Sequence, residues 1–296
     1  MTGSASDATV GVIGLGLMGS ALADVLMTQG FDLRVWNRSR EKCERFAASG
    51  VPVGDSAEIL ANECEVLVVC LTDHAASMEV LQSGALAKRL EGKTLVLLTT
   101  MTAEDSLAAA DWAAENRIHY LDGAILAYPR EVRDMTCMIV YSGPRAVFDA
   151  CKPVLDAMGG MPRLVGDEAG TAIRFASAIY TVYYAHAVGM IQGAAMCTAA
   201  GAPLDVFTEL TTDYWDWPED DVHLLDRIAT RNYAVQEAAL EIHATGFGTT
   251  PPLCDQLGVS SELPRVIAGL LDEALRQGYA NDELPALFEV LSKPGK

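Results

Sequence analysis

The sequence predicts an α/β domain with a parallel, doubly wound sheet, followed by an all-helical domain. Short apolar runs alternate with helical patterns through the first half of the 296-residue chain, as expected for a parallel sheet covered by helices. A glycine-rich turn follows the first of these runs. After Gly166 the strand pattern stops, and helices punctuated by glycine and proline continue. We therefore place a sheet domain at residues 1–165 and a helical domain at residues 166–296.

Each element of the sheet domain is predicted from its apolar pattern. Runs of aliphatic and β-branched residues indicate strands, and apolar residues at helical spacing indicate helices. The predicted strands are 10–13, 33–36, 66–71, 94–99, 119–121, 136–141 and 161–165. The predicted helices are 20–29, 41–49, 75–81, 103–116 and 144–158. From residue 169 onward almost no strand pattern is present.

Composition excludes several classes of protein. Hydrophobic residues make up 50% of the chain, which is enough for a substantial core. With 21 basic and 40 acidic residues the formal net charge is −19, so nucleic acid and anionic membrane surfaces are poor partners. The 7 cysteines are dispersed, and neither they nor the 5 histidines show zinc-ligand spacing. We expect reduced thiols in a cytoplasmic protein, with no metal.

One segment imitates a membrane span. Residues 172–200 are apolar over a length that can cross a bilayer. However, Arg174, His186, Gln192 and three tyrosines interrupt the segment, and these side chains are costly in lipid. We therefore expect a helix buried between protein surfaces. The first residues also lack the basic and apolar regions of a signal peptide.

A dinucleotide-binding fingerprint follows the first predicted strand and opens the first predicted helix, which is the context that this motif requires. It consists of Gly14, Leu15, Gly16, Leu17, Met18 and Gly19. The first glycine permits the tight turn, the second lets the backbone approach a pyrophosphate, and the third allows close helix–strand packing. The pyrophosphate is then expected at the helix N-terminus. The sequence therefore predicts a Rossmann domain.

The loop after the second strand indicates which dinucleotide binds. An NAD enzyme usually has an acidic residue there for the ribose 2′-hydroxyl, but this chain has Asn37, Arg38, Ser39 and Arg40. Arginine can pair with a 2′-phosphate through its planar fork, and serine can add a hydrogen bond. We predict NADPH; a solvated basic loop is the alternative. Further cofactor contacts are predicted at Leu71, Thr72, Thr100, Met101 and Thr102, which end or follow the next two strands.

These segments resemble the imine reductases, a family within the β-hydroxyacid dehydrogenase superfamily. The similarity covers essentially the whole chain. Its motifs are GVIGLGLMGSALA at 11–23, VWNRSREK at 35–42, LTTMT at 98–102 and LDGAILAYP at 121–129. The resemblance implies a long interdomain helix, a helical domain that intertwines with that of a second subunit, and an active site at the dimer interface.

The resemblance also bears on the substrate. The hydroxyacid branch holds a carboxylate with Asp-x-Pro-Val-Ser-Gly-Gly and moves a proton with a lysine. The matching residues 122–128 are largely apolar here, and counting from Gly170 puts Arg174 at the lysine position. Arginine keeps its proton and cannot serve as acid and base, although it can still bind an anion. We predict NADPH-dependent reduction of an imine or iminium C=N bond. A β-hydroxyacid dehydrogenase and an NADPH-binding protein with little catalysis remain the alternatives.

The predicted proton donor departs from the family pattern. The usual aspartate or tyrosine falls at or near Ala176, beside Ser177, and a second family tyrosine matches Tyr184. We predict Tyr184 and Ser177 as the catalytic groups; the alternative for Tyr184 is a core tyrosine. Substrate contacts are predicted at Leu126, Tyr128, Arg174, Tyr180, Trp217 and His243. For Trp217 and His243, ordinary packing is the alternative.

Overall fold

The computed structural model describes residues 8–213 and 217–292, the side chains of 213–221 excepted. The chain divides into two compact units, Met1–Thr181 and Val182–Lys296, which we call the sheet unit and the helical unit. The division falls inside helix α9, Thr171–Ala199, later than the boundary expected from the sequence. The reason is that the first turns of α9 are hydrogen-bonded to the sheet.

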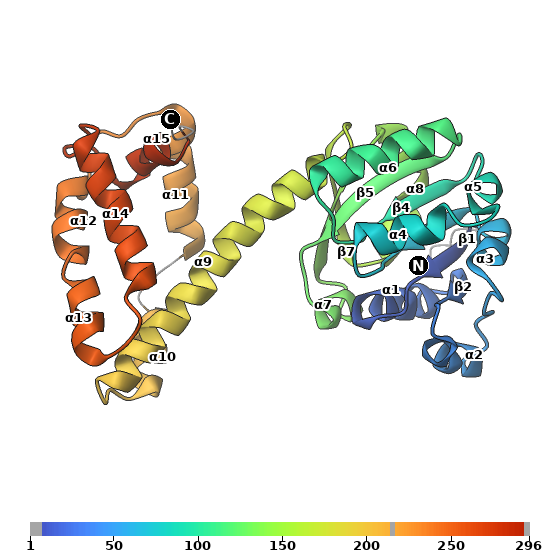
Figure 1. Ribbon diagram of the computed structural model, residues 1–296, viewed down its shortest axis with the longest axis horizontal. Coiled ribbons are helices and arrows are strands. Elements are labelled where there is room, and N and C mark those ends of the chain that lie inside the picture. The colour runs from blue at the N-terminus through green and yellow to red at the C-terminus, as the bar shows by residue number, and fades with distance from the viewer. Residues whose placement is uncertain (1–7, 214–216, 293–296) are drawn as a thin grey trace, which may run out of the picture. The chain divides into compact units, whose positions relative to one another are not determined.

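A seven-stranded sheet forms the centre of the sheet unit, in the order β2-β1-β3-β4-β5-β6-β7 (Figure 1). Each predicted strand is present, but the sheet is not wholly parallel, because β6 pairs with β5 in antiparallel orientation. The central strands are apolar on both faces, since helices cover both sides. The strands are β1 Thr9–Ile13, β2 Asp32–Trp36, β3 Val66–Val69, β4 Thr94–Leu97, β5 His119–Ile125, β6 Cys137–Ser142 and β7 Gly160–Gly166.

Two hydrophobic cores lie on the two faces of the sheet. Val10 and Val12 of β1 contribute to one core, with residues of α1, α2 and α8, whereas Ile13 contributes to the other, with residues of α3, α4, α5 and α6. This is the alternation expected along a strand. The helices are α1 Leu17–Thr28, η1 Arg40–Cys43, α2 Glu44–Ala48, α3 Ala57–Glu63, α4 His74–Leu81, α5 Leu86–Arg89, α6 Ala103–Glu115, α7 Pro129–Arg133 and α8 Arg145–Ala157.

The sequence did not predict three short helices, α3, α5 and α7. Each has between four and seven residues, which is too short for a helical repeat to stand out. Local signals define their starts: Ser56 accepts a hydrogen bond from the Ile59 N–H, and Pro129 opens α7. The predicted helix at 41–49 is divided between η1 and α2.

A buried carboxylate joins the start of α9 to the sheet. Asp122 of β5 accepts hydrogen bonds from the Ser142 hydroxyl at 2.9 Å and from the Gly170 N–H at 3.3 Å. The Ser142 oxygen in turn accepts the Ala172 N–H at 2.9 Å. Burial raises the pKa of Asp122, although the Ser142 and Gly170 hydrogen bonds act in the opposite direction. These contacts hold the first turn of α9 against β5 and β6.

The helical unit has a small core of its own. Leu240, Leu271, Ala274 and Ala286 are buried together. Beyond α9 its helices are α10 Leu204–Asp213, α11 Trp217–Thr230, α12 Leu240–Phe247, α13 Thr250–Leu257, α14 Glu262–Arg276, η2 Leu284–Ala286 and α15 Leu287–Leu291. Among its described residues, two isolated antiparallel bridges, at Ala234 and Ala239, are the β structure of this unit. Within the ranges that the structure describes, no helix combines the length and apolar character needed to span a membrane.

Candidate cofactor and active site

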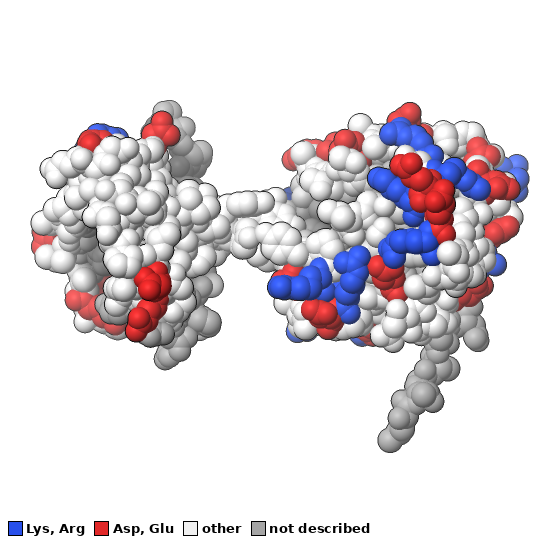
Figure 2. Space-filling model, turned by 90° about the horizontal axis from the view of Figure 1, so that it is seen from below, with Lys and Arg blue, Asp and Glu red and all other residues white. Residues whose placement is uncertain are grey.

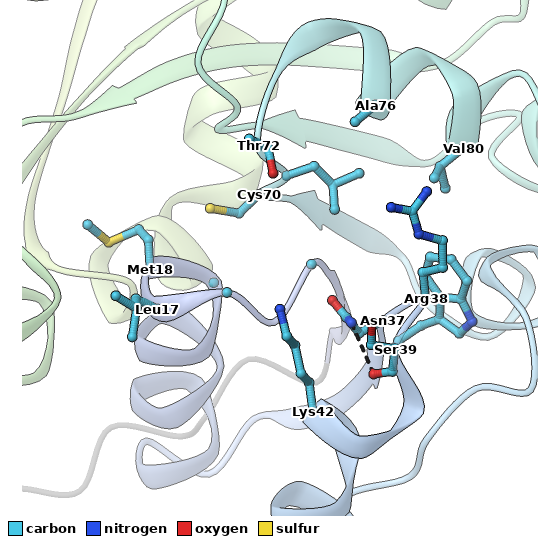
Figure 3. A pocket seen from close by; sticks show the side chains of 15 residues that line it. Leu17, Met18, Asn37, Arg38, Ser39, Lys42, Cys70, Thr72, Ala76 and Val80 are labelled. Atoms are coloured by element: carbon cyan, nitrogen blue, oxygen red, sulfur yellow. Dashed lines mark hydrogen bonds between the residues drawn. The ribbon is translucent and has the colours of Figure 1, made fainter.

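A cleft of about 310 Å³ lies at the carboxyl ends of β1, β2 and β3 (Figure 3). Its floor is the glycine-rich turn between β1 and α1, whose helix N-terminus favours an anion. We call it the dinucleotide cleft. It is lined by Gly14, Gly16, Leu17, Met18, Gly19, Trp36, Asn37, Arg38, Ser39, Lys42, Cys70, Leu71, Thr72, Ala76 and Val80.

The glycines of this turn have different roles. Gly14 has a φ of +96°, and a Cβ at Gly19 would collide with the Gly14 carbonyl oxygen. Both are therefore required by the fold itself. At Gly16 a Cβ would meet nothing within 4 Å. Its missing side chain therefore leaves open the space through which a pyrophosphate would approach.

Gly16→Ala is expected to leave the melting temperature of the free protein unchanged but to weaken NADPH binding by about tenfold or more, because the new methyl group occupies the approach to the pyrophosphate. Gly19→Ala is the matched control. Its methyl group collides with backbone, so we expect destabilisation of about 1–3 kcal/mol. Thermal melts and NADPH titrations of both variants check this. Tight NADPH binding by Gly16→Ala would contradict the assignment.

Asn37 connects the two loops that form this cleft. Its Oδ1 accepts the Leu15 N–H at 2.9 Å, and its Nδ2 donates to the Ser39 carbonyl at 3.1 Å. Leu15 itself is buried and does not line the cleft. Asn37 thus fixes the arginine loop relative to the glycine turn.

The two arginines of this loop point in different directions, Arg38 into the cleft and Arg40 away from it. Arg38 and Ser39 line the dinucleotide cleft, but Arg40 donates to the Gly54 carbonyl at 2.7 Å and lies 3.5 Å from Asp55. Arg40 is therefore not among the residues that line this cleft, and its contact with the cofactor stays a prediction. Lys42 takes its place in the lining, and Figure 3 shows its side chain extending into the cleft.

Sequence reasoning missed Lys42 because its orientation depends on a local turn. The Lys42 N–H donates to the Ser39 carbonyl at 3.2 Å, within the single turn of 3₁₀ helix η1. In a 3₁₀ helix residues three apart lie above one another. The sequence signal for Lys42 was its position three residues after Ser39, which places both residues on the same side of a 3₁₀ turn.

A second cavity of about 360 Å³ lies within the sheet unit, at the ends of β3, β4 and β5. It shares Met18, Cys70 and Leu71 with the dinucleotide cleft. Its other lining residues are Leu98, Thr99, Thr100, Met101, Gly123, Ala124, Ile125, Ile173, Ala176, Ser177 and Tyr180. Six residues that the sequence singled out thus meet here beside the cleft: Met18, Leu71, Thr100, Met101, Ser177 and Tyr180.

Two residues of α9 that line this cavity, Ser177 and Tyr180, carry hydroxyl groups. The Ser177 hydroxyl donates to the Ile173 carbonyl at 2.8 Å, and the Tyr180 hydroxyl donates to the Ile125 carbonyl at 2.9 Å. Because a carbonyl carries no proton, each hydroxyl must be the donor in its bond. In this structure the hydroxyl protons of Ser177 and Tyr180 are thus directed to backbone carbonyls.

Four predicted contacts lie elsewhere in the sheet unit. Thr102 caps α6 through a reciprocal pair of hydrogen bonds with Asp105, and the Leu126 N–H donates to the Met138 carbonyl. Tyr128 is exposed at the start of α7, and Arg174 lies 3.6 Å from Glu168. None of these four residues lines either cavity, and their contacts with cofactor or substrate stay predictions.

The remaining predicted site residues belong to the helical unit. Tyr184 is 62% exposed, with its ring against Tyr183 at 5.2 Å between centroids. His243 is half-buried on α12. Trp217 opens α11, but its side chain lies outside the described residues. The roles of these three residues stay predictions.

Comparison with known proteins matches both parts of the chain. Residues 9–167 match the family described as the NAD binding domain of 6-phosphogluconate dehydrogenase. Residues 168–293 match the NADPH-dependent reductive aminase-like C-terminal domain. A relative, the NADPH-dependent reductive aminase of Aspergillus oryzae, is 26% identical over 97% of this chain and 98% of its own length.

Solved structures are similar over the same extent. An imine reductase from Myxococcus stipitatus in complex with NADP⁺ has a TM-score of 0.91 and 28% identity, covering 96% of this chain and 99% of that chain. A reductive aminase from Aspergillus terreus in complex with NADPH and ethyl-5-oxohexanoate has a TM-score of 0.89 and 25% identity, covering 97% and 100%.

Proposed function

The chain belongs to the imine reductase and reductive aminase family of NADPH-dependent oxidoreductases, and we propose that it reduces an apolar imine or iminium to an amine. The second cavity carries this proposal. Its described lining contains no charged side chain, so it offers nothing to neutralise a substrate carboxylate. Bound NADPH supplies the hydride, and the apolar lining positions the C=N carbon and excludes water.

The decisive experiment compares two substrate classes. The protein is incubated with NADPH and a small cyclic imine, and separately with NADP⁺ and a panel of hydroxyacids, while NADPH absorbance is followed. We expect consumption of NADPH with the imine alone. Oxidation of hydroxyacids without imine turnover would establish the dehydrogenase instead. Tight NADPH binding without turnover of any C=N or C=O substrate would favour a binding protein.

The groups that hold the 2′-phosphate are proposed to be Arg38, Ser39 and Lys42. Two cations and a hydroxyl line the dinucleotide cleft, which suits the charge and the acceptor oxygens of a phosphate. The loop contains no acidic side chain between Asn37 and Arg40. NADPH rather than NADH is therefore the expected cofactor.

The proton on the substrate nitrogen is proposed to arrive with the substrate. The hydroxyls of Ser177 and Tyr180 donate hydrogen bonds to backbone carbonyls. Their oxygens are therefore better suited to accept a hydrogen bond from the N–H of an iminium cation than to donate one to the lone pair of a neutral imine. Ala176, at the position of the usual family acid, contributes no proton. Tyr184 remains our candidate for a further polar group near the nitrogen.

A pH profile tests this route for the proton. For a basic cyclic imine, kcat/KM is expected to fall about tenfold per pH unit above the pKa of the imine, because only the protonated form reacts. An N-alkylated cyclic iminium of the same ring is permanently charged, and its kcat/KM should stay level over the same range. A shared fall for both substrates would instead indicate a titrating group of the enzyme.

We further propose a homodimer in the cytoplasm. Apolar side chains are exposed in the helical unit, including Val182, Val188 and Ile191 of α9, and Figure 2 shows few charged side chains on its visible face. An apolar surface of this kind favours a protein partner, and a second copy is the partner that the family resemblance implies. Light scattering after size exclusion should give twice the 31.6 kDa chain mass. All 7 cysteines are free thiols, which supports a reducing compartment.

A further inference from the structure

Two buried hydroxyl groups connect the walls of the two cavities. Thr99 follows β4, is 2% exposed and lines the second cavity, whereas Ser77 of α4 is fully buried and lines neither cavity. The Ser77 Oγ and the Thr99 Oγ1 are 2.8 Å apart. Thr99 falls within the LTTMT segment at 98–102, but neither hydroxyl was among the predicted contacts.

The direction of these hydrogen bonds follows from the number of protons. The Ser77 hydroxyl can only donate to the Asp73 carbonyl, which lies 3.1 Å away. Both bonds of Ser77 therefore form together when Thr99 is the donor to Ser77. The Thr99 oxygen accepts the Leu71 N–H at 3.2 Å. The result is a continuous chain from the Leu71 N–H through Thr99 and Ser77 to the Asp73 carbonyl, in which each hydroxyl donates once and accepts once.

Both ends of this chain lie in residues 71–73, which belong to the four-residue segment 70–73 that joins β3 to α4. Leu71 lines both cavities, and Thr72 lines the dinucleotide cleft. The Asp73 carboxylate caps α4 by accepting the Ala76 N–H at 2.8 Å, and Ala76 lines the cleft as well. Thr99 thus fixes, through Ser77, the position of a turn that contributes to the walls on both sides.

We propose that Ser77 and Thr99 are positioning residues for the cofactor. They hold the 71–73 turn in the position, relative to the dinucleotide cleft, that binding of the dinucleotide requires. Ser77 acts without touching the cofactor, through Thr99 and the backbone of the turn. The proposal rests on the dinucleotide site and not on the identity of the reduced substrate. Its test therefore measures NADPH binding, which does not depend on imine turnover.

The test compares near-isosteric variants. Thr99→Val keeps the shape and removes the hydroxyl, whereas Thr99→Ser keeps the hydroxyl. We expect Thr99→Val and Ser77→Ala to weaken NADPH binding about tenfold, as the loss of a buried hydrogen bond implies, and Thr99→Ser to stay within about twofold of the parent. The double variant Ser77→Ala/Thr99→Val should lose no more than the worse single variant, since both changes break one chain.

A matched control separates positioning from general destabilisation. Ser106 is another fully buried serine, on α6, whose hydroxyl lies 3.4 Å from that of Tyr120 and which lines neither cavity. Ser106→Ala is expected to leave the NADPH dissociation constant unchanged. Equal binding by Thr99→Val and Thr99→Ser would overturn the proposal, as would an equal loss in Ser106→Ala. The Thr99 pair decides the matter even if Ser77→Ala does not fold.

Discussion

Arg38→Asp is expected to raise the dissociation constant for NADPH about a hundredfold while changing that for NADH much less. A charge-assisted hydrogen bond to phosphate contributes about 1.5–3 kcal/mol, and an aspartate in the same place adds repulsion. NADH carries no 2′-phosphate, so neither effect applies to it. Lys42→Ala removes the second cation from the cleft and should raise the dissociation constant for NADPH about tenfold. Titration of each variant with both cofactors measures the preference.

The control comes from the same loop. Arg40→Asp makes the same change of charge two residues away, but the Arg40 guanidinium donates to the Gly54 carbonyl and does not line the cleft. We expect its preference for NADPH to remain close to that of the parent. Equal losses of NADPH and NADH in Arg38→Asp would mean that the loop does not read the 2′-phosphate. Equal effects at 38 and 40 would mean that only the general charge of the loop matters.

The second large effect is expected in the helical unit, at a buried ion pair. Arg227 and Glu283 lie 3.0 Å apart, with side chains only 6% and 8% exposed. Glu283 also accepts the N–H groups of Gln236 and Glu237, and Arg227 donates to the Ala234 carbonyl. Glu283→Gln leaves the buried guanidinium without its counter-charge, which should destabilise this unit by about 3–5 kcal/mol. Urea unfolding followed by circular dichroism measures the loss.

An exposed pair supplies the matched comparison. Glu273 pairs with Arg276 on α14, where the side chains are 33% and 70% exposed. Glu273→Gln makes the same chemical change in the same unit, and we expect a loss of no more than about 1 kcal/mol. Similar losses at 273 and 283 would show that burial does not decide the strength of the Arg227–Glu283 pair.

The pair also predicts a pH dependence. Burial raises the pKa of Glu283, but the hydrogen bonds from Gln236 and Glu237 and the charge of Arg227 outweigh it, so the pKa is lowered from its usual 4.5. A lowered carboxyl pKa contributes stability that is present above pH 4.5 and is lost as the pH falls through the folded-state value. Acid unfolding of the parent should therefore be steeper below pH 4.5 than that of Glu283→Gln.

Several features of this protein could be predicted from local pattern alone. The glycine turn, the predicted strands and the change to helices after the sheet all follow from short-range periodicity and glycine spacing. The arginine loop likewise indicated NADPH because no acidic residue stands where the ribose hydroxyl would need one. These inferences succeed because the information lies within a few residues.

The orientation of side chains within the same loops required the tertiary structure. Arg40 and Lys42 are two residues apart and both basic. Arg40 is hydrogen-bonded to the Gly54 carbonyl outside the cleft, whereas the 3₁₀ turn places Lys42 in the cleft lining. Counting from Gly170 places Arg174 at the lysine position of the hydroxyacid branch. In the structure Arg174 lies 3.6 Å from Glu168 and lines neither cavity.

The order of the strands, the glycine-rich turn and the absence of an acid at position 176 could therefore all be read from the sequence. Only the folded chain shows that Asp122 joins α9 to the sheet, that the Ser177 and Tyr180 hydroxyls donate to backbone carbonyls, and that Ser77 is hydrogen-bonded to Thr99. The physical reason is the same in each case. Hydrogen bonds join groups that are 20 or more residues apart, or commit a proton to a backbone carbonyl, and neither leaves a periodic trace in the sequence.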